Sequence, residues 1–279
     1  MRVMLISSLA RLIAAVRING VQPTVHCKRI YYRKRRYWYS PFVVWGANVV
    51  LRALGIKARF LPLSRWTHRE RDVYRFLYEE DVFIGPDDSV YAPARSGVCL
   101  VEYITNSKRS NAEKRAAVSA AAAALWRLHM NVLPHVGRTD MLSHGDATVL
   151  NVIYDPVVDS AQWIDFETMH APYVNALDRQ ADDLHTFLFS VLSHTAEEEF
   201  VSRLEGIRQN YTDDETWLAI VAALERERWT MIYHMARARV DWERYQAIKG
   251  KLLEHLSRMK SRTESAAETV AFKKEVDDE

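Results

Sequence analysis

Residues 142–151 of this 279-residue chain read LSHGDATVLN, and residues 163–167 shortly after them read WIDFE. The first stretch carries Asp146 with Asn151 five residues later, and Asp165 follows fourteen residues after Asn151. An ionised carboxylate only accepts hydrogen bonds, so Asp146 is suited to orient and deprotonate an attacking hydroxyl group. Asn151 and Asp165 carry oxygen atoms, the ligands that a hard cation such as Mg²⁺ requires. The spacing therefore predicts a general base and a magnesium site in one short part of the chain.

The residues around these polar positions predict a β-hairpin. Apolar and β-branched residues surround Asn151 at 149–153, Asp155-Pro156 marks a turn, and the apolar run before Asp165 is typical of a second short strand. Such a hairpin brings Asn151 and Asp165 together. A purely structural hairpin is the alternative interpretation, in which the acidic residues cap a turn and end a strand and His144 is a hydrogen-bonded core histidine.

The segment resembles the catalytic core of the aminoglycoside phosphotransferase and choline kinase branch of the protein-kinase-like fold, and that of small bacterial lipopolysaccharide-type kinases. The resemblance rests on His-Gly-Asp at residues 144–146, on Asn151 and on Asp165. It implies that Asp146 is the catalytic base and that Asn151 and Asp165 bind magnesium. It also implies that His144 packs beneath the catalytic loop and that the cofactors are ATP and Mg²⁺.

The resemblance covers roughly residues 100–188, and its specific part runs from Asp146 to Asp165. Phe166-Glu167 stands where protein kinases have Phe-Gly, a departure that small-molecule kinases share. The connection at residues 168–180 is short and lacks an Ala-Pro-Glu signature. These features favour a small-molecule or glycan hydroxyl acceptor over a polypeptide.

The first part of the chain predicts a small lobe of strands and helices. Aromatic and β-branched composition predicts strands at residues 25–39, 58–63, 83–84, 90–91 and 98–103. An apolar stretch predicts a helix at 41–54, and apolar spacing predicts another at 66–79. Thr67, with Glu70 three residues later, is typical of a capping box at the start of the second helix.

By the same resemblance, a lysine on a strand of this lobe holds the phosphates, and a glutamate on the following helix orients it. Glu70 is the candidate glutamate, with helix capping as its alternative role. Lys34 is favoured as the lysine because it lies in a strong strand pattern, while Lys28 and Lys57 stay open. Glu102 is a further candidate for binding the nucleotide. The chain has no Gly-x-Gly-x-x-Gly loop, so a glycine-rich phosphate cradle is not expected.

Helix-forming sequence dominates the rest of the chain, at residues 111–130, 176–192, 198–209, 216–240 and 242–259. Asp183, directly before Leu184, resembles the residue that hydrogen-bonds the catalytic loop in this superfamily; a place in the first helical turn is its alternative. Aromatic and cationic residues of the late helices are candidates for the acceptor site or for the core, namely Trp217, Trp229, Tyr233, His234, Arg237, Arg239, Trp242 and Tyr245.

We therefore predict an α+β, two-lobed protein-kinase-like fold. The expected parts are a small β-rich N-terminal lobe at residues 1–103 that clamps the nucleotide, a larger, mainly helical catalytic lobe at 104–262, and a polar tail at 263–279. The expected function is ATP-dependent transfer of the γ-phosphoryl group to a hydroxyl of a small-molecule or glycan acceptor.

Two other functions compete with this interpretation. One is a metal-dependent hydrolase in which His144, Asp146, Asp165 and His170 bind metal ions. It leaves Asn151 unexplained. The other is a protein-kinase-like module or pseudoenzyme that binds nucleotide without turnover.

Composition sets further limits on partners and location. The 38 Lys and Arg nearly balance the 36 Asp and Glu, so no specific nucleic-acid partner is expected, although the basic run at 28–36 stays open as a solvated strand or a binding patch. Cys27 and Cys99 are too few for a disulfide framework, which favours the cytoplasm.

Residues 1–18 lack a secretory cleavage site and predict an amphipathic helix, with peripheral contact to the cytoplasmic face of a membrane as the alternative. The composition indicates no oligomeric state.

Overall fold

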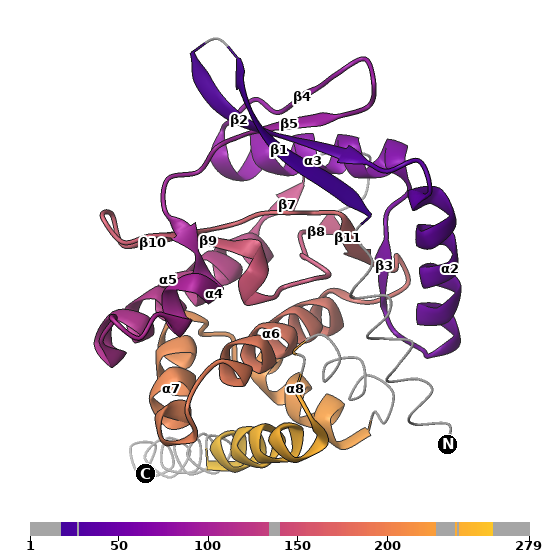
Figure 1. Ribbon diagram of the computed structural model, residues 1–279. Coiled ribbons are helices and arrows are strands. Elements are labelled where there is room, and N and C mark those ends of the chain that lie inside the picture. Colours follow the sequence, from indigo (N-terminus) through magenta and orange to yellow (C-terminus); the bar gives the residue numbers. More distant parts are fainter. Residues whose placement is uncertain (1–17, 27, 134–139, 227–237, 239, 259–279) are drawn as a thin grey trace, which may run out of the picture.

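The computed structural model describes residues 18–26, 28–133, 140–226, 238 and 240–258 (Figure 1). It is an α+β structure, with a small antiparallel sheet near the N-terminus and a mostly helical remainder, as the sequence predicts at that level. The polar tail at 263–279, most of the predicted N-terminal helix, and residues 227–237 of the predicted helix at 216–240 lie outside the described residues.

The N-terminal sheet has four antiparallel strands in the order β1-β2-β5-β4. Their bounds are β1 Asn19–His26, β2 Arg29–Arg36, β4 Phe83–Ile84 and β5 Val90–Pro93. In β2 the side chains of Lys34 and Arg36 are buried whereas that of Arg35 is exposed, because successive residues of a strand point to opposite faces. The sheet therefore turns two cations of the basic run toward the interior of the protein.

Helix α3, Leu63–Tyr78, packs beside this sheet and buries Trp66, Val73 and Tyr74. It begins three residues before the predicted start, because Pro62 enters it from an extended backbone with φ already at −62°. The predicted capping box is wrong: Thr67 lies inside the helix and its hydroxyl donates to the carbonyl oxygen of Ser64.

Helix α2, Ser40–Ala53, confirms the predicted helix at 41–54 and packs against strand β3, Ala58–Phe60. Strand β3 pairs with β11, Thr168–His170, across a long stretch of sequence. The predicted strand at 98–103 is only partly right, since β6, Val98–Cys99, passes directly into helix α4, Leu100–Thr105. Leu100, Tyr103 and Ile104 are buried on one face, which is the spacing of a helix rather than of a strand.

The predicted hairpin is confirmed. Strands β9, Val152–Asp155, and β10, Ser160–Trp163, pair in antiparallel fashion, and β6 pairs with the other edge of β9. A short 3-10 turn, η1, Val149–Asn151, leads into β9. The hairpin lies on helix α5, Asn111–Met130, where the indole of Trp163 donates to the carbonyl oxygen of Ala121 at 3.3 Å.

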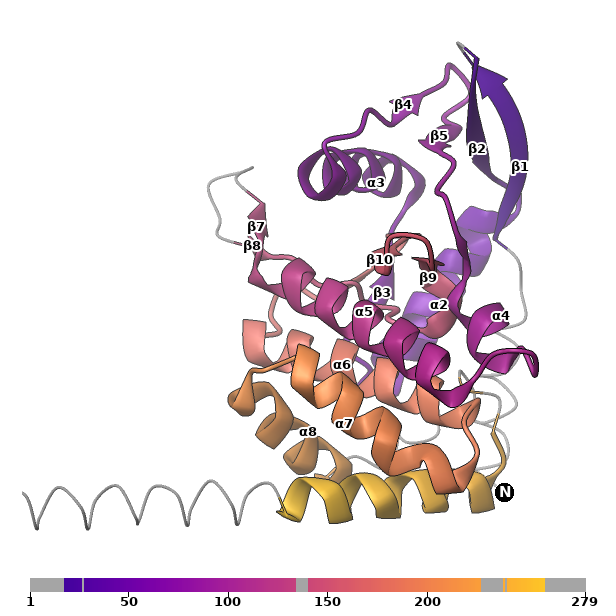
Figure 2. The ribbon, with the colours of Figure 1, turned by 90° about the vertical axis from the view of Figure 1, so that its left-hand side faces the viewer.

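Helices below the sheet form the remainder of the structure, and α5, α6 and α7 lie as stacked layers in Figure 2. Ser110 and Glu113 cap the start of α5 reciprocally, the capping box that the sequence reasoning had placed elsewhere. A short strand pair, β7 Val132–Leu133 with β8 Asp140–Met141, follows α5. No helix in the described part of the chain is long and apolar enough to cross a membrane. The bounds are α5 Asn111–Met130, α6 Ala176–Ser193, η2 Glu197–Glu199, α7 Phe200–Asn210, α8 Asp214–Arg226 and a further helix at 242–258.

Candidate active site

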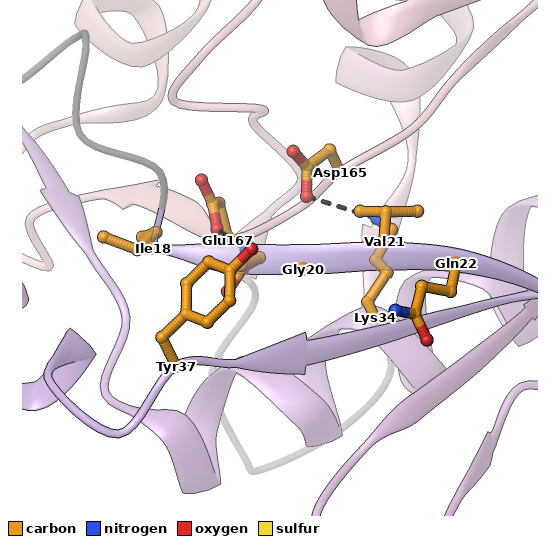
Figure 3. Close-up of a pocket in the computed structure, with 9 residues that line it drawn as sticks. Ile18, Gly20, Val21, Gln22, Lys34, Tyr37, Asp165 and Glu167 are labelled. Atoms are coloured by element: carbon orange, nitrogen blue, oxygen red, sulfur yellow. Dashed lines mark hydrogen bonds and ion pairs between the residues drawn. The ribbon is translucent and has the colours of Figure 1, made fainter.

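A buried ion-pair cluster joins strand β2, helix α3 and the segment after β10. The amine of Lys34 lies 2.5 Å from Oε1 of Glu70 and 3.2 Å from Oδ1 of Asp165, and Figure 3 shows the second contact. Oε2 of Glu70 accepts the backbone N–H of Phe166 at 2.9 Å. Of the three candidate lysines, Lys34 is the one that meets Glu70, whereas Lys57 pairs with Asp178 at 3.0 Å. Glu70 is thus a buried partner of a lysine rather than a helix cap.

The charges of this cluster depend on each other. Burial disfavours the charged form of Lys34, but the carboxylates of Asp165 and Glu70 outweigh it and raise the pKa of Lys34 well above its usual value. Burial also raises the pKa of Glu70, and the positive charge of Lys34 opposes that shift. Glu70 has no exposed surface, so the cluster is shielded from solvent on this side.

The hairpin brings Asn151 next to the segment of Asp165, as predicted. The backbone N–H of Ile164 donates to the carbonyl oxygen of Asn151 at 2.9 Å. The side-chain nitrogen of Asn151 donates to the carbonyl oxygen of Asp146 at 2.9 Å, which leaves the amide oxygen as the group suited to bind a cation. Asp165 has a φ of 67°, a left-handed conformation that aspartate tolerates better than most residues.

Asp183 holds the loop that carries Asp146. Its two carboxylate oxygens accept the backbone N–H groups of His144 at 2.6 Å and Gly145 at 2.8 Å. A third contact, at 3.0 Å, joins it to Nε2 of His129. Asp183 is fully buried and lies well inside α6, so its alternative role in the first helical turn is wrong; Asp178 occupies that turn. The position of the loop is therefore fixed by charge-assisted hydrogen bonds.

Gly145 is required at its position by both conformation and space. Its φ is 77°, and a Cβ atom there would approach the backbone of Met169 in β11 to 2.9 Å. The hydroxyl of Thr168 donates to the carbonyl oxygen of His144 at 3.2 Å, which ties the same strand to the loop. Strand β11 thus supports the loop in addition to Asp183.

His144 is a buried, neutral histidine packed against Trp163 and Phe166. Burial lowers its pKa to about 4. Its Nε2 donates to the carbonyl oxygen of Ile164 at 2.9 Å, and its Nδ1 accepts the backbone N–H of Asp146 at 3.2 Å. Both ring nitrogens are used, so His144 supports the loop and is not available to bind a metal ion.

His170, the second histidine that the metal-dependent hydrolase would need as a ligand, also has both ring nitrogens in contact with other side chains. Nδ1 of His170 lies 2.9 Å from the hydroxyl of Ser143, and its Nε2 lies 3.1 Å from Asp182. Within the described ranges, no group of three or more His, Cys, Asp or Glu side chains is arranged to hold a metal ion. The geometry therefore counts against a metal site built from His144, Asp146, Asp165 and His170.

Glu167 is a site residue that the sequence reasoning treated only as a departure from protein kinases. It lines a cavity of about 420 Å³ together with Lys34 and Asp165, under strand β1 (Figure 3). Burial, followed by the nearby charge of Asp165, raises the pKa of Glu167 to about 8. Its carboxylate also accepts a hydrogen bond from the side chain of Asn19. Its position two residues after Asp165, the predicted metal ligand, was the available signal in the sequence.

Arg36 is a second residue that the reasoning missed. It lies two residues after Lys34 on the same face of β2, and its side chain is 8% exposed. Its guanidinium lies 5.0 Å above the ring of Trp66. Burial lowers its pKa, and the charges of Glu167 and Asp165 oppose that shift. Nε and Nη2 have no hydrogen-bond partner among the described residues.

The remaining candidates are not part of this cluster. Glu102 lies exposed on α4, and no hydrogen bond or ion pair within the described residues joins it to Lys34 or Glu70. Trp217 and Tyr245 are buried core residues rather than an open acceptor surface. Trp229, Tyr233, His234, Arg237 and Arg239 lie outside the described residues.

Comparison with known proteins adds no assignment: the chain matches no protein-family model, and no curated protein is significantly similar to it in sequence. The geometry of the site carries the functional argument.

Proposed function

We propose that this protein is an ATP-dependent phosphotransferase with a two-lobed protein-kinase-like fold, acting on a hydroxyl of a small-molecule or glycan acceptor. The observation that carries the proposal is the contact of Lys34 with both Glu70 and Asp165, next to a loop anchored by Asp183. A lysine oriented by a buried glutamate and set beside a metal-binding aspartate is the arrangement that such enzymes use to hold nucleotide phosphates. In this proposal residues 1–103 form the nucleotide-clamping lobe and 104–262 the catalytic lobe.

The donor set of the cavity fits a magnesium ion accompanied by phosphates. Asp165 and Glu167 offer two carboxylates in the cavity, and Asn151, whose backbone is hydrogen-bonded to Ile164 beside them, offers an amide oxygen. Burial, followed by the nearby charge of Asp165, raises the pKa of Glu167, and a divalent cation between the two carboxylates would relieve their repulsion. Mg²⁺ usually takes only one or two protein carboxylates and completes its shell with phosphate and water oxygens. Magnesium-bound ATP supplies the transferable phosphoryl group and charge neutralisation at the phosphates.

Asp146 is the proposed base. In the reaction, the acceptor oxygen forms a bond to the γ-phosphorus while the bond from that phosphorus to the β–γ bridging oxygen breaks. The acceptor proton passes to the carboxylate of Asp146, and the electron pair of the broken bond leaves with ADP. Lys34 and Arg36 stabilise the negative charge on the phosphates. The Asp183 contacts hold the loop in place before substrate binds, so little reorganisation is needed during the transfer.

One face of the β1–β2 hairpin offers an apolar surface on which the nucleotide base could lie. Val21 is the register partner of Lys34, and Val25 is the partner of Ile30, so all four residues share one face. Val21, Val25 and Ile30 are 54%, 72% and 58% exposed, which leaves an apolar surface beside the phosphate-binding lysine. A flat heteroaromatic base is suited to such a surface.

The short connection after the metal-binding segment supports a small acceptor. Residues 168–180 are used by strand β11, a turn and the start of α6. This leaves no long segment for docking a peptide substrate. Sugars, amino alcohols and lipopolysaccharide-type hydroxyls are therefore the proposed acceptor classes.

The test is a transfer assay with ATP labelled in the γ position and a panel of sugars, amino alcohols, lipopolysaccharide-type glycans and casein-like proteins, with and without magnesium. Magnesium-dependent labelling of a small-molecule or glycan acceptor, absent in Asp146→Asn, supports the proposal. Labelling of proteins alone would overturn the acceptor class. Tight nucleotide binding with no transfer to any acceptor or to water would favour the pseudoenzyme.

A further inference from the structure

Charge is distributed very unevenly along this chain. The first 69 residues contain fourteen of the 38 Lys and Arg and none of the 36 Asp and Glu, the first of which is Glu70. Among described residues of this part, Arg29, Arg35 and Arg52 are exposed. Residues 18–69 therefore add only positive charge to the described surface, where Asp87 pairs with Arg33 and Arg35 and Asp178 pairs with Lys57, and this excess favours an anionic partner.

Helix α2 lies in this part and is apolar on both of its sides. Its inner face buries Val44, Ala47 and Leu51, the last of these in a small core with Ile56 and Ala58. Before Arg52 near its end, the helix contains no charged residue. A helix that is apolar all round is normally enclosed on all sides, but α2 forms an outer edge of the described structure (Figure 1).

The outer side of α2 carries large apolar side chains that are about half exposed or more. Phe42, Trp45 and Val49 are 73%, 72% and 49% exposed, and their spacing of three and four residues places them on one face. Trp38, just before the helix, is 85% exposed. We call these four residues the aromatic face. It far exceeds the scattered single apolar residues that are normal on a protein surface.

We propose that the aromatic face binds the surface of an anionic lipid membrane, with α2 lying in the plane of the interface. Tryptophan is enriched at the boundary between lipid headgroups and acyl chains. In this proposal Phe42 and Val49 insert on the acyl-chain side of that boundary. Arg52 lies on the same helix and is exposed, and residues 18–69 contribute no acidic side chain that would repel anionic headgroups; Asp87, from outside this part, is paired with Arg33 and Arg35. The proposal goes beyond phosphotransfer and does not depend on it.

A nucleic acid fits the same charge less well. Phosphate backbones are contacted by cations and polar groups spread along the interface, whereas the aromatic face itself contains no Lys or Arg. The spacing of Phe42, Trp45 and Val49 follows one helix face, which suits insertion along a plane rather than stacking on successive bases.

The binding test is co-sedimentation of the full-length protein with vesicles of phosphatidylcholine alone, or of phosphatidylcholine and phosphatidylglycerol in equal parts. We expect binding to the anionic vesicles that weakens with added salt. The variant Trp38→Ser/Phe42→Ser/Trp45→Ser should bind at least about tenfold more weakly, since three large apolar groups lose their burial. A matched control, Val157→Ser/Val158→Ser/Leu218→Ser, removes side chains that are 89%, 65% and 48% exposed elsewhere, and it should bind as the parent does.

A second measurement reports insertion directly and does not depend on weakened binding. Trp38→Phe/Trp45→Phe keeps the apolar character of the face but removes its indoles. Quenching of tryptophan emission by brominated lipids should be marked in the parent and strongly reduced in this variant, while sedimentation with vesicles persists.

Several outcomes would overturn the proposal. These are failure of the parent to sediment with anionic vesicles, equal binding by the serine variant in its folded form, and equal quenching in the phenylalanine variant. Retention on duplex DNA that the serine variant abolishes, without vesicle binding, would assign the face to nucleic acid instead. A parent dimer that the serine variant converts to a monomer, again without vesicle binding, would assign it to self-association.

Discussion

Replacing Lys34 by methionine tests the centre of the proposed site through stability as well as activity. The substitution removes a cation that contacts both Glu70 and Asp165 and leaves the carboxylate of Glu70 fully buried. The N–H of Phe166 still donates to one of its oxygens, but the oxygen that faced the amine loses its partner.

The expected loss of stability follows from this burial. Removing one partner of a buried ion pair costs about 3–5 kcal/mol, because a charge is left without compensation. For a chain of this size, each kcal/mol lowers the melting temperature by about 2–4 °C, so the predicted drop is about 6–20 °C. Burial already raises the pKa of Glu70, and losing Lys34 raises it further. The loss of stability of Lys34→Met should therefore grow as pH rises. Glu70 of the folded variant keeps its proton while Glu70 of the unfolded chain releases it, and this difference favours the unfolded state.

Two comparison variants make this prediction specific. Lys34→Met/Glu70→Gln removes both charges and should recover much of the loss, because a neutral pair of similar volume is tolerated in a core. Lys57→Met breaks the pair with Asp178, whose side chains are 32% and 43% exposed, and should cost less than about 1 kcal/mol.

Thermal unfolding followed by circular dichroism provides the stability measurement, and steady-state transfer provides the activity. In turnover, Lys34→Met, Glu70→Gln and the double variant should be similarly impaired, because each breaks the same unit. The reasoning fails if Lys34→Met unfolds at the same temperature as Lys57→Met, or if the two substitutions at the buried pair act additively.

Four further outcomes follow from the site. Asp146→Asn should lower phosphoryl transfer at least about a hundredfold while calorimetry finds nucleotide binding unchanged; transfer at the parental rate would exclude it as the base. Asp165→Asn should bind ATP with nearly the same affinity with and without magnesium, and a parental magnesium response would contradict its role as a ligand. The folded-state pKa of Glu167, about 8, lies above its ordinary value of 4.5, so the parent loses stability as pH rises between these values. Glutamine does not titrate, so the melting temperature of Glu167→Gln minus that of the parent should increase as pH rises across that range. A difference in melting temperature that stays constant with pH would refute the raised pKa. Gly145→Ala should destabilise the protein by at least about 1–2 kcal/mol, because φ there is 77° and the β11 backbone leaves no room; an unchanged denaturation midpoint would count against the loop geometry.

Local sequence patterns predicted the parts of the site that lie close together in the chain. The hairpin at β9 and β10 followed from a turn between two apolar runs, and it sets Asn151 beside the Asp165 segment. The contact of Lys34 with Glu70 spans 36 residues. The strand pattern favoured Lys34 without excluding Lys28 and Lys57, and the helix pattern offered Glu70 as the glutamate. Periodicity gives the face of each element, and the fold then brings those faces together.

Other features depend on context that the sequence does not contain. Thr67 and Glu70 match a capping box in spacing, but Pro62 starts the helix earlier and Glu70 is turned inward. Residues 100–103 suit a strand or a helix equally in composition, and burial of one face against α5 decides for the helix. Glu167 owes its raised pKa first to burial and then to the charge of Asp165, both of which require the folded cavity.

The absence of a glycine-rich loop can be understood from the two buried cations of β2. Backbone N–H groups of such a loop normally surround the phosphates, but here a regular hairpin, β1 with β2, lies above the cavity. Burying the guanidinium of Arg36 while Nε and Nη2 lack partners among the described residues opposes folding, because a buried donor without an acceptor loses its hydration. Under the proposed function, Lys34, which lines the cavity, would contact the phosphate oxygens, and Arg36, which shares its face of β2 but does not line the cavity, would add its positive charge nearby. Side-chain cations on a rigid strand would then take the place of backbone amides in a flexible loop.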